Sequence, residues 1–243
     1  MAFANLRLIH HLRVVHVLIY AGSHLLLLLV VSNLILCQGQ ENKPPYCRNQ
    51  PGPCRIPLQS LFDRATVVAN YNSRIAREMF EKFDQQYGQG ISSTSKMVSN
   101  CHTASLATPD NKAKALNTED KVLFSLLINL LHSWDEPLHH ATTELPNLKG
   151  ASPAILAGAE EIKEKTKVLL EGVEVIQARV HPGEEEKKNA AYPVWSEQSS
   201  LKAQDESVRQ TAFYRMFYCL QRDSNKISTY LQILKCRLAS CQV

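Results

Sequence analysis

Apolar positions in this chain of 243 residues recur at helical spacing in four long segments. The clearest is the segment from Asp205 to Lys235, where apolar side chains alternate in steps of four and three residues. Ser224 is the only polar member of this series, which would lie along one face of a helix. A second stripe of Arg222, Lys226 and Tyr230 predicts a cationic and aromatic flank that is left free for a partner. The series consists of Phe213, Phe217, Leu220, Ser224, Ile227, Leu231 and Leu234.

Two of the other segments are also predicted to be long helices with one apolar face. The first runs from Leu58 to Tyr87 and ends before Gly88, as helices commonly do at glycine. The other starts at Pro153, a residue suited to the first helical position, and ends before the Pro182-Gly183 pair. Its apolar face follows steps of four and three residues: Ile155, Ala159, Ile162, Thr166, Leu169, Val173, Ile176 and Val180.

The second helix along the chain is expected to be bent. Asn117 and Thr118 offer an N-cap, and Glu119 and Asp120 suit the positive end of a helix. Pro137 lies inside this helix and should bend it, because proline removes a backbone donor and clashes with the preceding turn. The apolar face consists of Leu123, Leu127, Leu130, Trp134, Leu138 and Leu145.

The lengths of the connections predict the topology. A helix of about 30 residues is about 45 Å long, so the short Lys149–Pro153 connection makes the second and third helices antiparallel. Residues 91–116, with short helical turns, and residues 181–204 are long enough to run back along the bundle at about 3.3 Å per residue. The sequence therefore predicts an all-α, up-up-down-down four-helix bundle of the long-chain cytokine type. An up-down-up-down bundle would also close, but it needs no long connections.

The N-terminus has the pattern of a cleaved signal peptide. Arg7 and Arg13 precede an apolar run from Leu25 to Leu36, and Cys37-Gln38-Gly39 supplies small residues for cleavage. The alternative is a membrane anchor, but polar residues interrupt the run before about 20 apolar residues accumulate. We expect residues 1–39 to be removed and residues 40–243 to form one secreted, extracellular domain.

Cysteine content and charge fit such a secreted domain. Cysteines other than Cys37 form an even set, which is typical of a disulfide framework whose pairing the spacing leaves open. The net charge is only +4, so a nucleic-acid partner is not expected, and neither is membrane insertion. The set consists of Cys47, Cys54, Cys101, Cys219, Cys236 and Cys241.

Enzymatic activity is not expected. Four-helix bundles can house di-iron centres, but those need two Glu-x-x-His motifs, and here only Glu136 to His139 has that spacing and contains a proline. We therefore expect no metal, cofactor or catalytic residue. His132, His139 and His140 are interpreted as surface residues or contacts to a connection.

Several runs resemble the prolactin and growth-hormone family over essentially the whole mature chain. Within it, Cys47 and Cys54 resemble the prolactin branch, and the first helix and Ile162–Pro182 are most similar to placental lactogens. The resemblance implies the pairings Cys47–Cys54, Cys101–Cys219 and Cys236–Cys241. The runs are Leu58–Ala65, Cys101–Thr103, Ser133–Leu138, Leu169–Glu174, Tyr192–Ser196 and Ala212–Arg215.

The resemblance also implies a hormone that binds two copies of a prolactin-type cytokine receptor through two faces and starts JAK-STAT signalling. The second face would be a cleft between the first and third helices, with Arg64 and Gly172. A glycine inside a helix costs about 1 kcal/mol relative to alanine, which favours a special role. The first face would consist of Asn70, Ser73, Arg222, Asn225, Lys226 and Tyr230.

Other interpretations remain at this stage. The Arg222 stripe could be only a solvated helix edge, and Gly172 could be an incidental packing choice. Asn70, Ser73 and Asn225 stand where prolactins often present histidine, so a histidine-based, pH-sensitive or zinc-assisted contact is in doubt. The alternative functions are a prolactin-related protein with altered or non-activating receptor binding, and a ligand of both prolactin and growth-hormone receptors.

Overall fold

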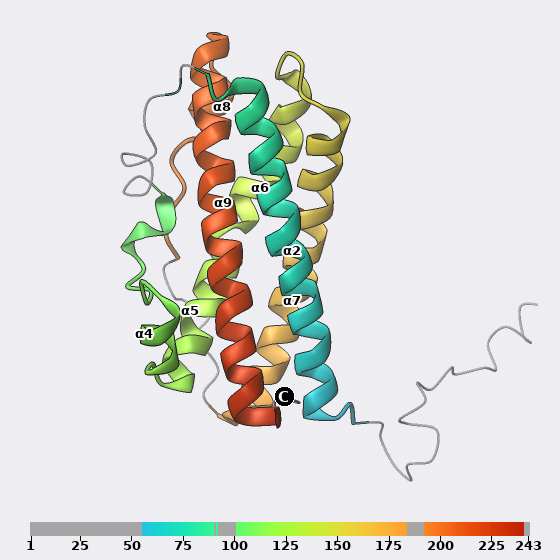
Figure 1. The fold of residues 1–243 in the computed structure, drawn as a ribbon, viewed down its shortest axis with the longest axis vertical. Helices are drawn as coiled ribbons and strands as arrows, with labels where there is room; N and C mark the ends of the chain where they lie inside the picture. The colour runs from blue at the N-terminus through green and yellow to red at the C-terminus, as the bar shows by residue number, and fades with distance from the viewer. Residues whose placement is uncertain (1–54, 90, 92–100, 184–191, 241–243) are drawn as a thin grey trace, which may run out of the picture. The chain divides into compact units, whose positions relative to one another are not determined.

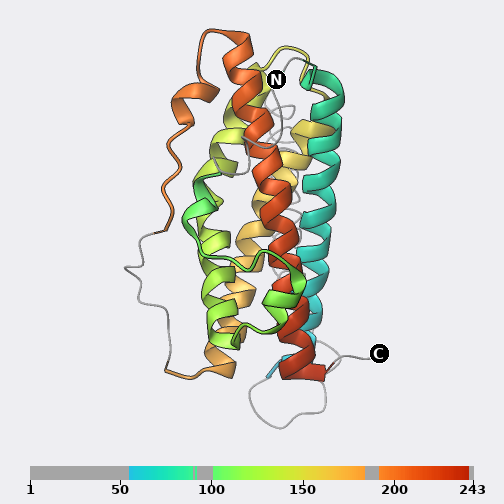
Figure 2. The same cartoon turned by 60° about the vertical axis from the view of Figure 1, so that its left-hand side comes forward.

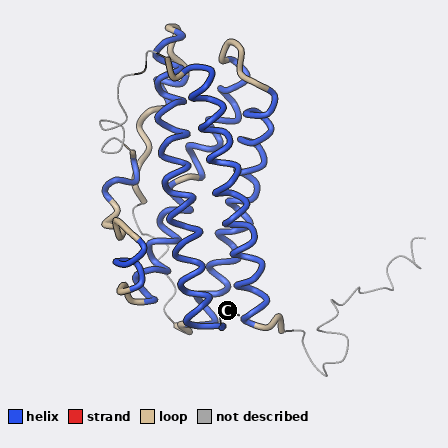
Figure 3. Tube along the Cα trace, in the orientation of Figure 1, coloured by secondary structure: helices blue, strands red, loops and turns tan. Residues whose placement is uncertain are grey.

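Helices α2 (Leu58–Tyr87) and α9 (Glu206–Lys235) lie side by side and run in opposite directions (Figure 1). The computed structural model describes residues 55–89, 91, 101–183 and 192–240, and these contain helices and loops but no strand (Figure 3). The other two members of the bundle are α7 (Pro153–Val180) and the pair α5 (Asp120–Ser133) and α6 (Asp135–Glu144). In Figure 1, α2 and α5–α6 run upward, whereas α7 and α9 run downward. The predicted up-up-down-down topology is confirmed.

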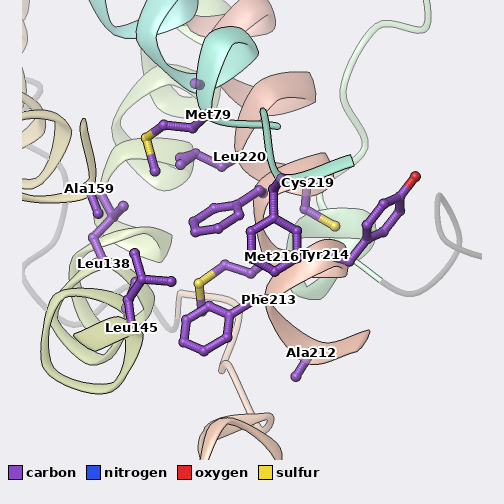
Figure 4. Packing of buried hydrophobic residues seen from close by; sticks show 14 of the residues in the cluster. Met79, Leu138, Leu145, Ala159, Ala212, Phe213, Tyr214, Met216, Cys219 and Leu220 are labelled. Carbon is purple, nitrogen blue, oxygen red and sulfur yellow. The ribbon is translucent and has the colours of Figure 1, made fainter. Parts of the chain in front are cut away.

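The apolar seams of the four helices meet in the core. Every residue of the α9 series is buried, Ser224 included, and the α7 series is buried up to Ile176. One cluster centres on Phe83, Leu138 and Phe213, some of whose members are drawn in Figure 4. The other, toward the start of α2, centres on Phe62 and Leu127. Each fully buried side chain of this size contributes about 1.5–3 kcal/mol, so the paired seams hold the bundle together.

The second bundle helix is broken near Pro137, as predicted, but the break precedes the proline. Helix α5 ends at Ser133, Trp134 lies between the helices, and Pro137 is in the first turn of α6. Proline has no N–H to offer the Ser133 carbonyl four residues earlier. That carbonyl instead accepts a hydrogen bond from His102 Nε2 at 2.8 Å, so the bend gains a partner from the first long connection.

The predicted N-cap of this helix is wrong. Asn117 and Thr118 belong to the end of a short helix, α4 (Lys112–Leu116), where the Thr118 hydroxyl donates to the Lys114 carbonyl. Helix α5 begins after Glu119, whose side chain makes no capping hydrogen bond. The residues that the sequence predicts at the start of α5 therefore belong to the end of α4 instead.

The first long connection includes a 3-10 turn, η2 (His102–Ser105), and α4, and it packs along α9 (Figure 2). The predicted Cys101–Cys219 disulfide is present and closes a loop of 118 residues. Constraining a loop of this length stabilises the fold by about 4–5 kcal/mol in the chain-entropy account. The disulfide therefore fixes the start of the connection against the middle of α9.

The second long connection is held by aromatic contacts, as its Tyr192 and Trp195 suggest. The Tyr192 ring stacks on His132 with ring centres 4.3 Å apart. Trp195 is buried in the core and stacks on His140 at 5.6 Å, just before α8 (Gln198–Leu201). These contacts confirm that His132 and His140 contact a connection, and His139 is exposed on the surface.

Some predictions concern residues outside the described ranges. They are the signal peptide of residues 1–39, the Cys47–Cys54 disulfide and the position of Cys241. Cys236, in the short π-helical turn η4 (Cys236–Ser240) that follows α9, is itself disulfide-bonded. Among the described residues, no helix is long and apolar enough to cross a membrane.

Candidate functional site

Three of the six residues expected in the first face come together on the surface between α2 and α9. The Ser73 hydroxyl donates to Asn225 Oδ1 at 2.6 Å. Asn70 Oδ1 accepts from the Ser228 hydroxyl at 2.6 Å and from Gln232 Nε2 at 2.9 Å. These groups form an uncharged polar surface that runs along both helices.

Arg222, Lys226 and Tyr230 lie on the neighbouring side of α9, beneath the first long connection. Arg222 Nη2 donates to the Thr103 hydroxyl at 2.6 Å, and Lys226 Nζ donates to the Thr108 hydroxyl at 2.6 Å. Tyr230 is only 2% exposed. The sequence predicts a free flank here, and that prediction is wrong at Tyr230, because residues 103–116 cover it. Helical periodicity shows which side of a helix is polar but not which loop packs on it.

Burial changes the titration of the covered residues. The pKa of the Tyr230 phenol is raised to about 12, chiefly because burial disfavours the charged phenolate. The pKa of the Lys226 ammonium is lowered by burial and by the neighbouring Arg222. This side of α9 therefore presents the half-buried cation of Lys226, and the neutral phenol of Tyr230 is buried one turn further along the helix.

A buried carboxylate that the sequence patterns did not reveal organises this region. Asp223 is 0% exposed, and its Oδ2 accepts from the Thr103 hydroxyl at 2.6 Å and from Trp134 Nε1 at 3.1 Å. Its Oδ1 accepts from Arg222 Nε at 2.8 Å. One side chain thus joins the first long connection, the bend before α6 and the Arg222 guanidinium. An acidic residue beside an apolar helical seam was the only available signal for it.

The second predicted face lies between α2 and α7. Tyr71 donates to Glu161 Oε1 at 2.7 Å, and Asn72 Nδ2 donates to Thr166 Oγ1 at 3.2 Å, which sets the antiparallel register of the two helices. Because both helices rise by about 1.5 Å per residue, this register brings Arg64 of α2 level with Gly172 of α7. Both predicted residues therefore lie at the same height of the α2–α7 surface.

Two glycines of α7 show why this position is unusual. A Cβ on Gly158 would lie 2.9 Å from the Met79 side chain, so α2 and α7 pack closely there and a larger residue would force that side chain to move. A Cβ on Gly172 would meet nothing within 4 Å. Packing within the chain thus does not require a glycine at position 172. Glycine also weakens a helix, and here its missing side chain leaves the surface open.

Apolar side chains are exposed one turn away from Gly172 and from Arg64. Val168 and Val175, one turn before and one turn after Gly172 on the same side of α7, are 60% and 51% exposed. Val67, one turn after Arg64 on α2, is 68% exposed. Exposed apolar side chains on neighbouring turns mark a surface that a partner can cover.

No metal centre emerges from the described residues. Nowhere in them do three or more histidine, cysteine, aspartate or glutamate side chains come close enough to hold a metal ion. The α2–α9 and α2–α7 faces are the candidate surfaces for binding a partner.

The fold has a polar face between α2 and α9 and an apolar face between α2 and α7. Together these features define a four-helix-bundle protein of the hormone and cytokine class. The chain belongs to the somatotropin hormone family, whose model matches residues 29–242. It is 72% identical over 221 residues to the chorionic somatomammotropin hormone of Ovis aries, covering 91% of this chain and 92% of that protein. It is 68% identical over 220 residues to chorionic somatomammotropin hormone 1 of Bos taurus, covering 90% and 92%. Members of this family are secreted signalling hormones and not enzymes.

Proposed function

We propose that the chain is a secreted lactogenic and somatogenic hormone that binds two prolactin-type cytokine receptors and triggers JAK-STAT signalling. The observation that carries this proposal is the open, apolar surface around Gly172, which the packing of the chain does not require. The names of the two relatives support a somatomammotropic activity. Signalling by receptor dimerisation needs two separate surfaces, which the α2–α9 and α2–α7 faces would supply.

The first receptor would bind the α2–α9 face. Asn70, Ser73 and Asn225 offer uncharged donors and acceptors at the surface, and Arg222 and Lys226 add positive charge at its edge. Arg222 is held by a buried carboxylate, so it is preorganised and loses little side-chain entropy on binding. Tyr230 contributes through packing beneath this edge.

The second receptor would bind the α2–α7 surface at Gly172. The missing side chain allows a receptor group to approach the α7 backbone, and the valines around it supply apolar area. Burial of that area yields about 25 cal/mol per Å², the usual driving force for association. Arg64, level with the glycine, adds charge at the rim.

Residues 1–39 would direct secretion and be removed, which leaves residues 40–243 as the hormone domain. Two further disulfides, Cys47–Cys54 and Cys236–Cys241, would complete the set around the Cys101–Cys219 bond.

A second candidate is a prolactin-related protein with altered receptor preference, including binding to the growth-hormone receptor or binding without activation. It is favoured by Asn70, Ser73 and Asn225, which place uncharged amide and hydroxyl groups at positions where histidine is frequent in prolactins. The two candidates differ in the receptor that the first face selects and in whether the bound receptor is activated.

Binding of the mature protein to immobilised ectodomains of the prolactin and growth-hormone receptors tests the proposal. We expect tight binding to the prolactin-receptor ectodomain. Binding to the growth-hormone receptor alone would support the second candidate, and binding to neither would overturn both.

A further inference from the structure

Two polar residues interrupt otherwise apolar helical faces, and both line the same small cavity in the core. They are Thr166 in the α7 series and Ser224 in the α9 series, and both are buried. A third buried polar residue, Asn72 of α2, lines the cavity with them. Neither receptor face uses these three side chains, so their presence in the core needs another explanation.

The cavity has the size of a single water molecule. Its volume is about 10 Å³, which is about the minimum needed to hold one water. The rest of its wall comes from apolar side chains of α2, α5, α7 and α9 and from Trp134, and all of its lining residues are buried. A cavity lined only by such apolar groups would stay dry, but this one also has three polar side chains.

The amide of Asn72 is the group that most needs a partner there. It is 4% exposed, its Nδ2 donates to Thr166 Oγ1 at 3.2 Å, and its Oδ1 has neither a hydrogen-bond partner nor contact with solvent. Rotating the amide by half a turn would exchange the two atoms and leave the NH₂ group over instead. In either orientation one polar atom of the amide is orphaned, a state that folded proteins rarely tolerate.

We propose that this cavity is a binding site for one ordered internal water molecule. The water donates a hydrogen bond to Asn72 Oδ1 and exchanges further hydrogen bonds with the hydroxyls of Thr166 and Ser224. Buried waters typically make two to four such bonds to groups that would otherwise be unsatisfied, about the number available here. The polar residues in the two helical seams are then the ligands of this water.

The water links three helices at one point. Asn72 precedes Ser73 of the first face, Ser224 precedes Asn225 of the same face, and Thr166 lies on the helix that carries Gly172. A polar contact that is satisfied in only one alignment of the helices fixes their register, whereas apolar seams tolerate sliding. The water therefore holds α2, α7 and α9 in the alignment that forms both surfaces.

A crystal structure of the secreted protein at a resolution that shows ordered waters tests the proposal directly. We expect one water peak within about 3.2 Å of the Asn72 amide and of at least one of the two hydroxyls. An empty cavity, or an Asn72 amide fully bonded to protein atoms, would overturn the proposal.

Water relaxation dispersion provides an independent test in solution, because it counts long-lived internal waters. Asn72→Leu keeps the size of the side chain but removes its polar atoms, so the variant should contain one long-lived water fewer than the parent. Ser199→Ala, at an exposed serine of α8, is the matched control and should leave the number unchanged. An equal number in the parent and in Asn72→Leu would contradict the proposal, and the crystal structure of the parent decides if the variant does not fold.

Discussion

The indole Nε1 of Trp134 donates a hydrogen bond to Oδ2 of Asp223 at 3.1 Å, which joins the bend between α5 and α6 to the middle of α9. The same oxygen accepts from Thr103, so the first long connection is held at this point as well. The contact lies one residue from Arg222, at the edge of the first face. The stability of the bundle and the position of a candidate receptor contact thus depend on one carboxylate.

Replacing Asp223 with alanine should lower the free energy of unfolding by about 3 kcal/mol. The change leaves the Trp134 and Thr103 donors and the Arg222 cation without their acceptor, and breaking such a buried pair is strongly destabilising. Urea denaturation followed by circular dichroism measures this. Asp110→Ala, which breaks only the exposed pair with Lys114, should cost less than about 1 kcal/mol. Equal effects of the two changes would show that the Asp223 network is unimportant.

Stability should fall in acid partly because of His102. Burial lowers the pKa of its imidazole below the ordinary value of 6.5, with Asp223 opposing and Arg222 adding to the shift. Below pH 6.5 this imidazole therefore binds a proton more readily in the unfolded chain than in the folded chain. The free energy of unfolding should rise with pH up to about 6.5 and then no longer depend on this group. His102→Gln keeps a donor for the Ser133 carbonyl but does not titrate. Its thermal midpoint should depend less on pH between 5 and 7 than that of the parent, and an unchanged slope would contradict this role.

Gly172→Arg should convert the hormone into an antagonist. The arginine side chain would project into the open α2–α7 surface and block the second receptor, while the first face is untouched. Stability should not decrease, because a Cβ at this position meets nothing within 4 Å and glycine disfavours helix by about 1 kcal/mol. A cell line with a STAT-responsive reporter and prolactin receptor measures the loss of signalling.

Glu174→Arg is the matched control for that variant. It adds the same charged group two residues later on α7, at an exposed position that faces α5 and is turned by about 160° from Gly172. Signalling by the control should resemble that of the parent. If Gly172→Arg also signals like the parent, the second face is placed wrongly.

Chelation of zinc should leave binding to the first receptor unchanged. Ser73 and Asn225 face one another across α2 and α9 at 2.6 Å and cannot ligate zinc as imidazoles do. Replacing both with histidine would place one imidazole on each helix at this position and should make receptor binding sensitive to EDTA. Surface plasmon resonance with and without EDTA measures both proteins, and zinc-dependent binding of the parent would contradict a first face without zinc ligands at these positions.

Much of the fold was predictable because burial repeats with the period of the helix. The series from Phe213 to Leu234 in α9 and from Ile155 in α7 point into the core, and proline or glycine marks several helix ends. The break lies a few residues before Pro137, where the sequence predicts the bend. Proline acts on the carbonyl four residues earlier, so its effect appears at Ser133.

The candidate site was less predictable, because it depends on contacts between residues far apart in the chain. Periodicity along α9 could not reveal that residues 103–116 cover Tyr230, or that Asp223 meets Thr103 and Trp134. Such polar contacts have no repeat and are set by the path of a loop. Gly172 was identifiable because a glycine inside a helix departs from a local rule.

The stoichiometry of the complex between the mature protein and the soluble prolactin-receptor ectodomain tests the central claim most directly. Size-exclusion chromatography with light scattering should give two receptors per hormone for the parent and one for Gly172→Arg. A parent complex that contains only one receptor, or no complex at all, would contradict a hormone that uses both faces.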